Sequence, residues 1–277
     1  MSPSSDRPVE RQEGETSLPR TYFRPTEHHS RIVFLTGAGL SVAAGLSTFR
    51  GPDGLWALAP ELEAAMYAER LPGSLPQLWH VWAGMRRRAH AAGPTAGHRA
   101  IAAMGAPVIT QNVENLHQDA GSDEVIELHG TAARAVCLNP RCGWSMEVAG
   151  EGPGDGSTAQ DFGVPNLCPL CSAPTRPDVV LFGEMLPEEA MLTAMRRART
   201  CDLFVSVGTS GTVAPASLLA PLARDNGAET VCIDPAADSG AEAIFDHVIR
   251  HDAQQVLPSW VGITRRRSRN PFLDPFD

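Results

Sequence analysis

Short apolar runs rich in β-branched residues recur along the chain, and they constrain its fold more than any other feature. Five such runs lie at residues 31–36, 106–110, 124–128, 202–208 and 229–234. Segments of helical composition, among them 186–200 and 212–226, separate several of these runs. Strands that are apolar throughout and alternate with helices are typical of a mainly parallel sheet that is covered on both faces. We therefore expect an α/β fold built on such a sheet.

Two segments do not follow this alternation and predict a smaller, inserted lobe. Residues 57–100 have helical composition, and residues 131–175 hold four of the six cysteines. We expect these segments to form a helical module and a zinc-binding module. The predicted organisation is a disordered leader at 1–27, a sheet domain formed by 28–56, 101–130 and 176–262, the two inserted modules, and a tail at 263–277.

Charge and hydropathy argue against two classes of partner. The formal net charge is −9, and no basic stripe runs along a predicted helix, so the electrostatic footprint of a nucleic-acid-binding protein is missing. No stretch is apolar over the length of a membrane span. The first 30 residues lack the apolar core of a secretory signal, which favours the cytoplasm. The oligomeric state stays open.

The four clustered cysteines predict a structural zinc site. Cys137 and Cys142 are separated by four residues, Cys168 and Cys171 by two, and 25 residues lie between the pairs. Two pairs of thiolates on tight turns provide the four ligands of a tetrahedral zinc ion, so no coordination position is left for water. The alternative is four unrelated reduced thiols. The remaining two cysteines stand alone beside apolar residues and are expected in the core.

A glycine-rich turn follows the first apolar run and indicates a dinucleotide site. Gly37 and Gly39 match the first two positions of the G-x-G-x-x-G fingerprint, but Val42 occupies the third. The glycines allow the backbone to approach a phosphate, and a helix that begins near Ser41 would direct amide donors at the anion. Asp234, at the end of the last run, can accept hydrogen bonds from ribose hydroxyls, which favours NAD over NADP.

Polar residues at the ends of two other runs supply candidate chemistry. Gln111, Asn112 and Glu114 are hydrogen-bonding residues that can hold a ribose or a carboxamide. His129 is followed by a glycine at the edge of the crevice, and its unperturbed pKa of about 6.5 suits a general base. A single histidine at a strand end is more often structural, which is our expectation for His117.

Several features occur in a fixed order along the chain and identify a family resemblance. They are GAGLSVAAGLSTFRG, TQNVENLHQDAG, LHG, the two cysteine pairs, RPDVVLFGEMLP and GTSGTVAPA. In this order they resemble the motifs of sirtuins, the NAD-dependent protein deacylases, and the resemblance covers residues 28–262. It implies a Rossmann-like NAD domain and a zinc-bearing small lobe. It also implies that NAD binds in an inverted orientation, for which the third glycine is not expected.

The resemblance implies roles for individual residues. The cofactor residues are Gly37, Ala38, Gly39, Ser41, Gly208, Thr209 and Ser210 around the phosphates, Phe49 and Arg50 in the cofactor loop, Gln111 and Asn112 at the nicotinamide ribose, Glu114 at the carboxamide, and Asp234 and Ala253. His129 is the implied general base, which takes a proton from a ribose hydroxyl. The acyl oxygen of an acyl-lysine attacks the ribose carbon, and the products are nicotinamide, free lysine and 2′-O-acyl-ADP-ribose.

On the substrate side, the resemblance implies an acyl-lysine protein or peptide that binds as an added strand. Phe182, Gly183, Glu184 and Val213 pair with its backbone, Val180 and Leu186 line the acyl-lysine tunnel, and Trp82 and Met85 face the acyl group. Sirtuins that remove acidic acyl groups carry tyrosine and arginine at the positions of Trp82 and Met85. Because both residues are apolar here, a neutral acyl group is expected. A shift of the match by one residue would instead place Arg86 there.

Three residues depart from the family pattern. Glu114 replaces the usual aspartate, Ser47 replaces a common proline, and Asp234 replaces asparagine. The longer Glu114 side chain moves a charge at the reacting centre, where a small displacement costs rate. ADP-ribosyl transfer to protein therefore stays open as an alternative activity. A non-catalytic NAD sensor is disfavoured by the intact His129, and a dehydrogenase is disfavoured because its usual acid is missing after the glycine turn.

Overall fold

A six-stranded parallel sheet forms the centre of the chain, in the order β3-β2-β1-β7-β8-β9. The computed structural model describes residues 22–49, 54–148, 158–209, 211 and 213–264. The strands are β1 (Ile32–Thr36), β2 (Val108–Thr110), β3 (Val125–Glu127), β7 (Leu203–Val207), β8 (Glu229–Ile233) and β9 (His247–Ile249). The predicted parallel sheet is confirmed with its first five strands, whereas β9 has no counterpart among the apolar runs of the sequence.

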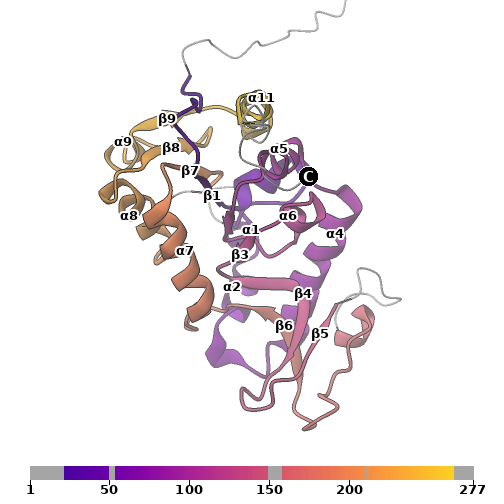
Figure 1. Cartoon of the computed structure of the whole chain (residues 1–277). Helices are drawn as coiled ribbons and strands as arrows, with labels where there is room; N and C mark the ends of the chain where they lie inside the picture. Colours follow the sequence, from indigo (N-terminus) through magenta and orange to yellow (C-terminus); the bar gives the residue numbers. More distant parts are fainter. Residues whose placement is uncertain (1–21, 50–53, 149–157, 210, 212, 265–277) are drawn as a thin grey trace, which may run out of the picture.

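Helices cover both faces of this sheet, and the side chains of each strand alternate between the faces (Figure 1). Ile32 and Phe34 of β1 face the core beneath α5, whereas Val33 and Leu35 face the core beneath α7. The helices of the first face are α5 (Ala96–Met104), α10 (Ala253–Val256), η6 (Leu257–Trp260) and α11 (Val261–Thr264). Those of the second face are α7 (Glu188–Thr200), η5 (Ala216–Leu218), α8 (Leu219–Asp225) and α9 (Ala241–Ile244). Because the central strands are buried on both sides, their sequences are largely apolar.

A smaller lobe, drawn below the large sheet in Figure 1, is formed mainly by the two inserted segments. Its helices are α1 (Leu55–Leu58), α2 (Pro60–Ala65), η2 (Ala68–Arg70), α3 (Leu75–Leu78), the π-helix η3 (Trp79–Ala83), α4 (Gly84–Ala92) and the 3₁₀ helix η4 (Ala159–Phe162). Its strands form an antiparallel sheet in the order β5-β4-β6, with β4 (Gly130–Cys137), β5 (Ser145–Glu147) and β6 (Thr175–Val179). The helical composition of residues 57–100 predicted the helices of that segment, whereas nothing in the cysteine pattern predicted η4 or the three strands. The exact domain boundaries stay a prediction.

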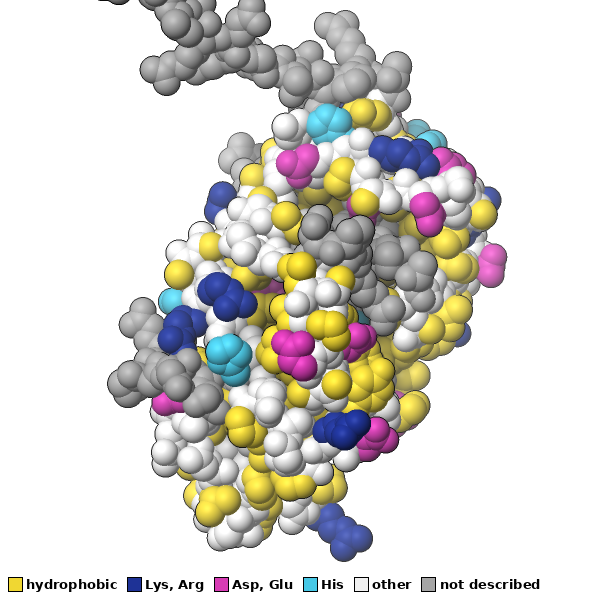
Figure 2. Space-filling model, turned by 180° about the vertical axis from the view of Figure 1, so that it is seen from behind, with side chains coloured by type: hydrophobic (Ala, Val, Ile, Leu, Met, Phe, Trp, Pro, Cys, Tyr) yellow, Lys and Arg dark blue, Asp and Glu magenta, His cyan; other side chains and the backbone are white. Residues whose placement is uncertain are grey.

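The face shown in Figure 2 carries dispersed charges. Its Arg side chains are scattered among hydrophobic and acidic ones instead of gathering in one stripe. This face therefore presents no continuous basic surface to a phosphate backbone. Among the helices of the described residues, none has the length and apolar character needed to cross a membrane.

The two sheets are joined at Gly130, the first residue of β4. Gly130 has a φ of +72°, and a Cβ at this position would overlap the carbonyl oxygen of Asp178 on β6. Gly130 pairs with Val179, and the backbone N of Val180 donates a hydrogen bond to the carbonyl oxygen of His129 at 2.9 Å. A side chain at residue 130 would therefore push β4 away from β6 and displace His129.

We predict that Gly130→Ala destabilises the protein more than the same substitution at an open turn. Gly121 also has a positive φ of +86°, but nothing lies within 4 Å of a Cβ built there. Gly121→Ala should cost only the strain of a left-handed backbone, about 1–2 kcal/mol, whereas Gly130→Ala adds the overlap with β6. Urea unfolding of both variants measures the two free energies. Equal losses would mean that β4 and β6 separate at no cost.

Candidate active site

The carboxyl ends of the central strands form one polar edge of the large sheet. The strand order reverses at β1, because the sequence continues to β2 on one side of β1 and to β7 on the other. Ligands of open parallel sheets bind at such a switch point. Gly37 follows β1, Gln111 and Asn112 follow β2, Gly208 follows β7 and Asp234 follows β8. The fold thus brings these predicted cofactor residues to one edge.

The turns that follow β1 and β7 touch through their backbones, and this contact requires the glycines. The backbone N of Gly39 donates to the carbonyl oxygen of Gly208 at 2.9 Å. A Cβ on Gly39 would lie 2.8 Å from the Cα of Gly208, and a Cβ on Gly208 would overlap the backbone N of Leu40. Val42, at the third position of the fingerprint, is 51% exposed. A side chain is tolerated there because that position faces solvent.

The segment after Gly37 is a 3₁₀ helix, η1 (Ala38–Ala44), and the prediction of a helix that begins near Ser41 is wrong. Ser41 instead lies buried in the middle of η1. Gln254 holds this segment from outside, because its Nε2 donates to the carbonyl oxygen of Leu40 at 3.0 Å and its Oε1 accepts from the backbone N of Gly97 at 2.7 Å. Sequence reasoning missed Gln254, since no local motif marks a contact across 214 residues.

Three predicted cofactor residues form a buried polar cluster at this edge. Asn112 Nδ2 donates to the carbonyl oxygen of Gly37 at 3.1 Å and to Ser41 Oγ at 3.2 Å. Ser41 Oγ donates to Glu114 Oε1 at 2.5 Å, and the backbone N of Val113 donates to Glu114 Oε2 at 3.0 Å. Burial raises the pKa of Glu114, although these hydrogen bonds oppose the shift. Both carboxyl oxygens of the longer side chain therefore have partners inside the protein.

His129 is half-buried and oriented by Gln111. His129 Nδ1 lies 2.9 Å from the carbonyl oxygen of Gln111, which can only accept, so Nδ1 carries the proton and Nε2 keeps its lone pair. The Gln111 side chain donates from Nε2 to Thr209 Oγ1 at 2.9 Å and so ties this residue to the turn after β7. Burial lowers the pKa of His129, and the Gln111 carbonyl opposes that effect. A neutral imidazole with an available Nε2 is the form that a general base requires.

An aromatic cluster lies between the segment that follows η1 and the segment that follows β6. Phe49 lies 5.4 Å from Trp56 and 5.6 Å from Trp82, measured between ring centroids. Phe182 lies 6.4 Å from Trp56 by the same measure. Phe49, Trp82 and Phe182 were predicted site residues, and the structure gathers them in one hydrophobic cluster. Trp56 was missed, and its only sequence signal is its position just after the glycine-rich stretch.

The side chains predicted to face the acyl group are apolar and buried. Trp82 is 6% exposed and Met85 is 7% exposed, and both belong to the hydrophobic cluster that contains Phe49. Arg86, the alternative at the neighbouring position, donates from Nη1 to Asp119 Oδ2 at 3.3 Å. The guanidinium of Arg86 is therefore already paired with a carboxylate.

The predicted peptide-binding segment after β6 is anchored on one side. The backbone N of Phe182 donates to the carbonyl oxygen of Met66 at 2.9 Å, and the carbonyl oxygen of Phe182 accepts from the backbone N of Ala68 at 3.0 Å. The carboxylate of Glu184 forms an ion pair with Arg176 at 2.9 Å. The backbone groups of Phe182 and the carboxylate of Glu184 thus already have partners within the protein. These contacts fix the turn between the two residues.

Other predicted residues lie apart from these clusters or outside the description. Leu186 packs against the core beneath α7, and Ala253 is buried in the core beneath α5. Val213 is described and half-buried. Arg50 and Ser210 lie outside the described residues. Asp234 is half-buried at the end of β8, and burial raises its pKa.

The four clustered cysteines converge as the sequence predicted. Their sulfur atoms all lie within 4.8 Å of one another, with Cys137 and Cys171 3.4 Å apart and Cys142 and Cys168 3.6 Å apart. A tetrahedral ion with bonds of about 2.3 Å to four thiolates requires sulfur atoms this close together. The donor set and its spacing therefore fit a structural zinc ion, which would join the turn after β4 to the turn before β6.

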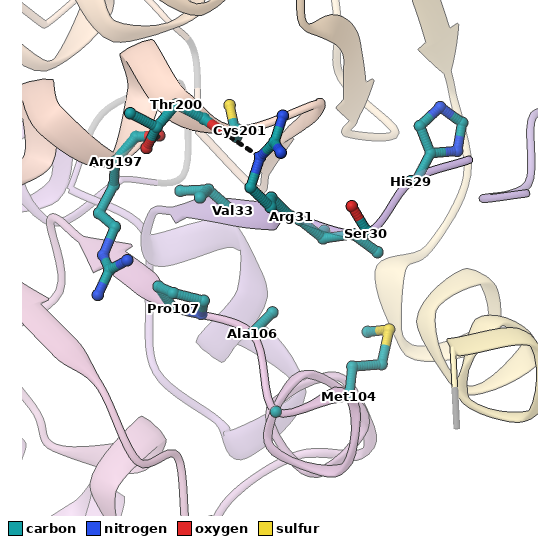
Figure 3. Close-up of a pocket in the computed structure, with 12 residues that line it drawn as sticks. His29, Ser30, Arg31, Val33, Met104, Ala106, Pro107, Arg197, Thr200 and Cys201 are labelled. Atoms are coloured by element: carbon teal, nitrogen blue, oxygen red, sulfur yellow. Dashed lines mark hydrogen bonds between the residues drawn. The ribbon is translucent and has the colours of Figure 1, made fainter. Parts of the chain in front are cut away.

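A cavity of about 290 Å³ lies at the opposite edge of the sheet, near the start of β1 and the end of α7 (Figure 3). Two arginines line it, and each already has a protein partner. Arg31 Nε donates to the carbonyl oxygen of Thr200 at 2.6 Å, drawn as a dashed line in Figure 3. Arg197 donates to both carboxylate oxygens of Glu124, at 2.8 and 2.5 Å. This cavity faces the amino ends of the strands and is separate from the candidate active site.

The fold and the site define an α/β protein with a dinucleotide crevice and a four-cysteine module, and comparisons with known proteins give its family. Residues 37–215 match the model of the Sir2 family. The chain is 41% identical over 243 residues to NAD-dependent protein deacylase 2 of Pyrobaculum aerophilum, a match that covers 86% of this chain and 92% of that protein. It is 39% identical over 242 residues to the NAD-dependent protein deacylase of Ralstonia nicotianae, covering 85% and 93%.

Solved structures agree with these matches. A mutant Sir2 homologue in complex with ADP-ribose superimposes with a TM-score of 0.77 at 32% identity and covers 86% of this chain and 93% of that chain. A complex of a Sir2 homologue with NAD has a TM-score of 0.74 at 32% identity and covers 86% and 90%. The chain belongs to the Sir2 family of NAD-dependent protein deacylases.

We predict one zinc ion per chain, held by the four clustered cysteines. Replacing Cys168 and Cys171 together by serine should release the ion, because a site with two remaining thiolates loses half of its ligands. Elemental analysis by mass spectrometry measures the zinc content. Cys201→Ala is the matched control, since this thiol is buried elsewhere and is not part of the cluster. Full zinc content in the double variant would contradict the assignment.

Proposed function

We propose that this enzyme transfers a neutral acyl group from a lysine side chain to the ADP-ribose part of NAD and releases nicotinamide. The observation that carries the proposal is the arrangement of His129, whose Nδ1 is fixed on Gln111 while Nε2 keeps its lone pair beside the polar edge. An NAD-binding module without catalysis has no use for such a base. The solved structures of Sir2 homologues include a complex with a p53 peptide and NAD, which supports a protein substrate.

His129 is proposed to accept a proton at Nε2 from a hydroxyl of the nicotinamide ribose. Gln111 and Asn112 hold that ribose, while the turns at Gly39 and Gly208 supply backbone groups to the phosphates. The hydroxyl becomes a better nucleophile as it loses its proton, and the imidazolium that forms is stabilised by the carbonyl oxygen of Gln111. The same proposal includes the roles that the family resemblance assigns to the other cofactor and substrate residues.

The preference for a neutral acyl group rests on the apolar surroundings of Trp82 and Met85. An acyl carboxylate buried beside these side chains would lose its hydration without gaining a cation, which costs several kcal/mol or more. Arg86 is paired with Asp119 and would have to break that contact to supply the charge. We further propose that the enzyme acts in the cytoplasm, where the zinc-binding thiols stay reduced before the ion binds.

Peptides that carry acetyl-lysine, long-chain acyl-lysine or succinyl-lysine test the reaction. With NAD, the first two should yield O-acyl-ADP-ribose and the third should not, because the pocket offers no partner for a carboxylate. Mass spectrometry of the products identifies each outcome. Succinyl removal would contradict the placement of Trp82 and Met85. ADP-ribose added to protein, with no acyl product, would favour ADP-ribosyl transfer.

The pH dependence tests His129 as the base. Because burial lowers its pKa below the usual value of about 6.5, the imidazole is mostly neutral at pH 6.5 and becomes mostly protonated only as the pH falls further. We expect kcat/KM for NAD to be level near neutrality and to fall only below about pH 6.5. His129→Ala should abolish nicotinamide release while NAD binding persists, and His80→Ala, an exposed control, should leave the profile unchanged. A midpoint above 6.5 would contradict the assignment.

A further inference from the structure

Two histidines are buried beside the active-site edge, and the proposed mechanism uses neither. His98 on α5 is 0% exposed and His117 on α6 (Leu116–Asp119) is 2% exposed. Their ring centroids are 4.6 Å apart with the planes tilted by 63°. His117 Nε2 lies 2.9 Å from Oγ1 of Thr36, the last residue of β1. A buried imidazole is thus attached to the strand end that leads into the glycine turn.

A line of hydrogen bonds connects His117 to a proposed NAD-binding residue. Thr36 Oγ1 donates to Thr110 Oγ1 at 2.9 Å, across the paired ends of β1 and β2. Thr110 Oγ1 also accepts from the backbone N of Asn112 at 3.0 Å. The Asn112 side chain then donates to the carbonyl oxygen of Gly37 at 3.1 Å. Two threonine hydroxyls therefore connect His117 to the backbone of Asn112.

The protons in this line can be placed from the partners of each atom. If His117 Nε2 carries the proton, it donates a hydrogen bond to Thr36 Oγ1. The hydroxyl of Thr36 in turn donates its hydrogen bond to Thr110 Oγ1. If Nδ1 carries the proton instead, it is a buried donor without an acceptor, because Nδ1 has no hydrogen-bond partner among the described residues. A buried donor without a partner is rarer than a buried acceptor without one. His117 is therefore the tautomer protonated at Nε2.

His98 has the complementary arrangement. Its Nδ1 accepts from the backbone N of Thr95 at 3.3 Å and lies 2.7 Å from Thr95 Oγ1, so its proton is on Nε2. This Nε2 also has no partner within the described part of the chain. The two rings in contact therefore each carry one nitrogen without a partner among the described residues. These are the donor Nε2 of His98 and the acceptor Nδ1 of His117. Burial lowers the pKa of His98 to about 2 and that of His117 to about 3, which keeps both rings neutral.

We propose that His98 and His117 form a neutral pair, locked as Nε2–H tautomers, that positions Asn112 for NAD through Thr36 and Thr110. The rings of His98 and His117 pack edge to face, and the Nε2–H group of His117 supplies the donor for Thr36. Both histidines are positioning residues, because neither belongs to the edge that faces the ligand. This inference rests on the proposed role of Asn112 in holding the ribose.

Nuclear magnetic resonance of protein with ¹⁵N-labelled histidines tests the tautomers without any reaction. We expect both residues to show a protonated Nε2 and a bare Nδ1, with no titration between about pH 5 and pH 8. Single substitutions of each histidine assign the signals. His98→Leu, which removes the ring that packs against His117, should shift the Nδ1 signal of His117. A proton on Nδ1 of His117, titration in this range, or an unchanged signal in His98→Leu would overturn the proposal.

Binding of NAD tests the positioning role. His117→Leu removes the donor at similar size, whereas His117→Gln keeps an amide donor near the place of Nε2. We expect the Kd for NAD, measured by calorimetry, to rise about tenfold in His117→Leu, the effect of one lost buried hydrogen bond, and to stay near the wild-type value in His117→Gln. In kinetics, KM for NAD should rise while KM for the acyl peptide changes little. An unchanged Kd in His117→Leu would overturn the proposal.

These two readouts separate this inference from the proposed deacylation. If the wild-type protein binds NAD but transfers no acyl group, deacylation fails while the calorimetric comparison still decides the role of His117. If deacylation proceeds and His117→Leu binds NAD normally, the positioning role fails alone. Urea unfolding of both variants excludes loss of the folded protein as the cause of weaker binding.

Discussion

The backbone contact between the turns after β1 and β7 is the constraint on which the site depends. The hydrogen bond from Gly39 to Gly208 is possible only because neither residue has a Cβ in the space between the turns. This contact closes the switch point of the sheet and sets the distance between the two groups of predicted phosphate-binding residues. Gln111 then joins the assembly by donating to Thr209, and its carbonyl oxygen orients His129. The position of the proposed base thus follows from the packing of two turns.

A second glycine controls how the small lobe meets this edge. His129 lies immediately before Gly130, where the chain turns from the large sheet into β4 with a φ that few other residues adopt. The proposed base therefore sits at the junction of the two sheets rather than on a free loop. Its carbonyl oxygen is held by Val180, and its ring by Gln111. The backbone and the side chain of one residue are fixed by different lobes, so a shift between the lobes would move the proposed base.

The sequence predicts the features that depend on local pattern and fails where contacts are long-range. The apolar runs locate five strands because burial on both faces leaves a continuous apolar signal. The strands of the small sheet carry polar or charged residues, and β9 has only two apolar residues, between His247 and Arg250, so none of them forms an apolar run. The cysteine spacing predicts the cluster because zinc geometry is strict. The structural reason for a glycine at position 39 could not be predicted, because the turn that it contacts lies about 170 residues away in the sequence. From the sequence alone, this glycine indicated only that a phosphate could approach the backbone.

The buried polar groups around the edge share one property, which is that burial favours their neutral forms. His98 and His117 have strongly lowered pKa values, and the pKa of Glu114 is raised. The two histidines hold their hydrogen-bond pattern near neutrality, because their pKa values of about 2 and about 3 lie far below it. His129 is less buried than these groups and keeps the lone pair of Nε2, so it is placed to accept a proton without disturbing them. Because the two neutral histidines are separate from the proposed base, the strand ends that they contact stay unchanged while the proton moves at His129.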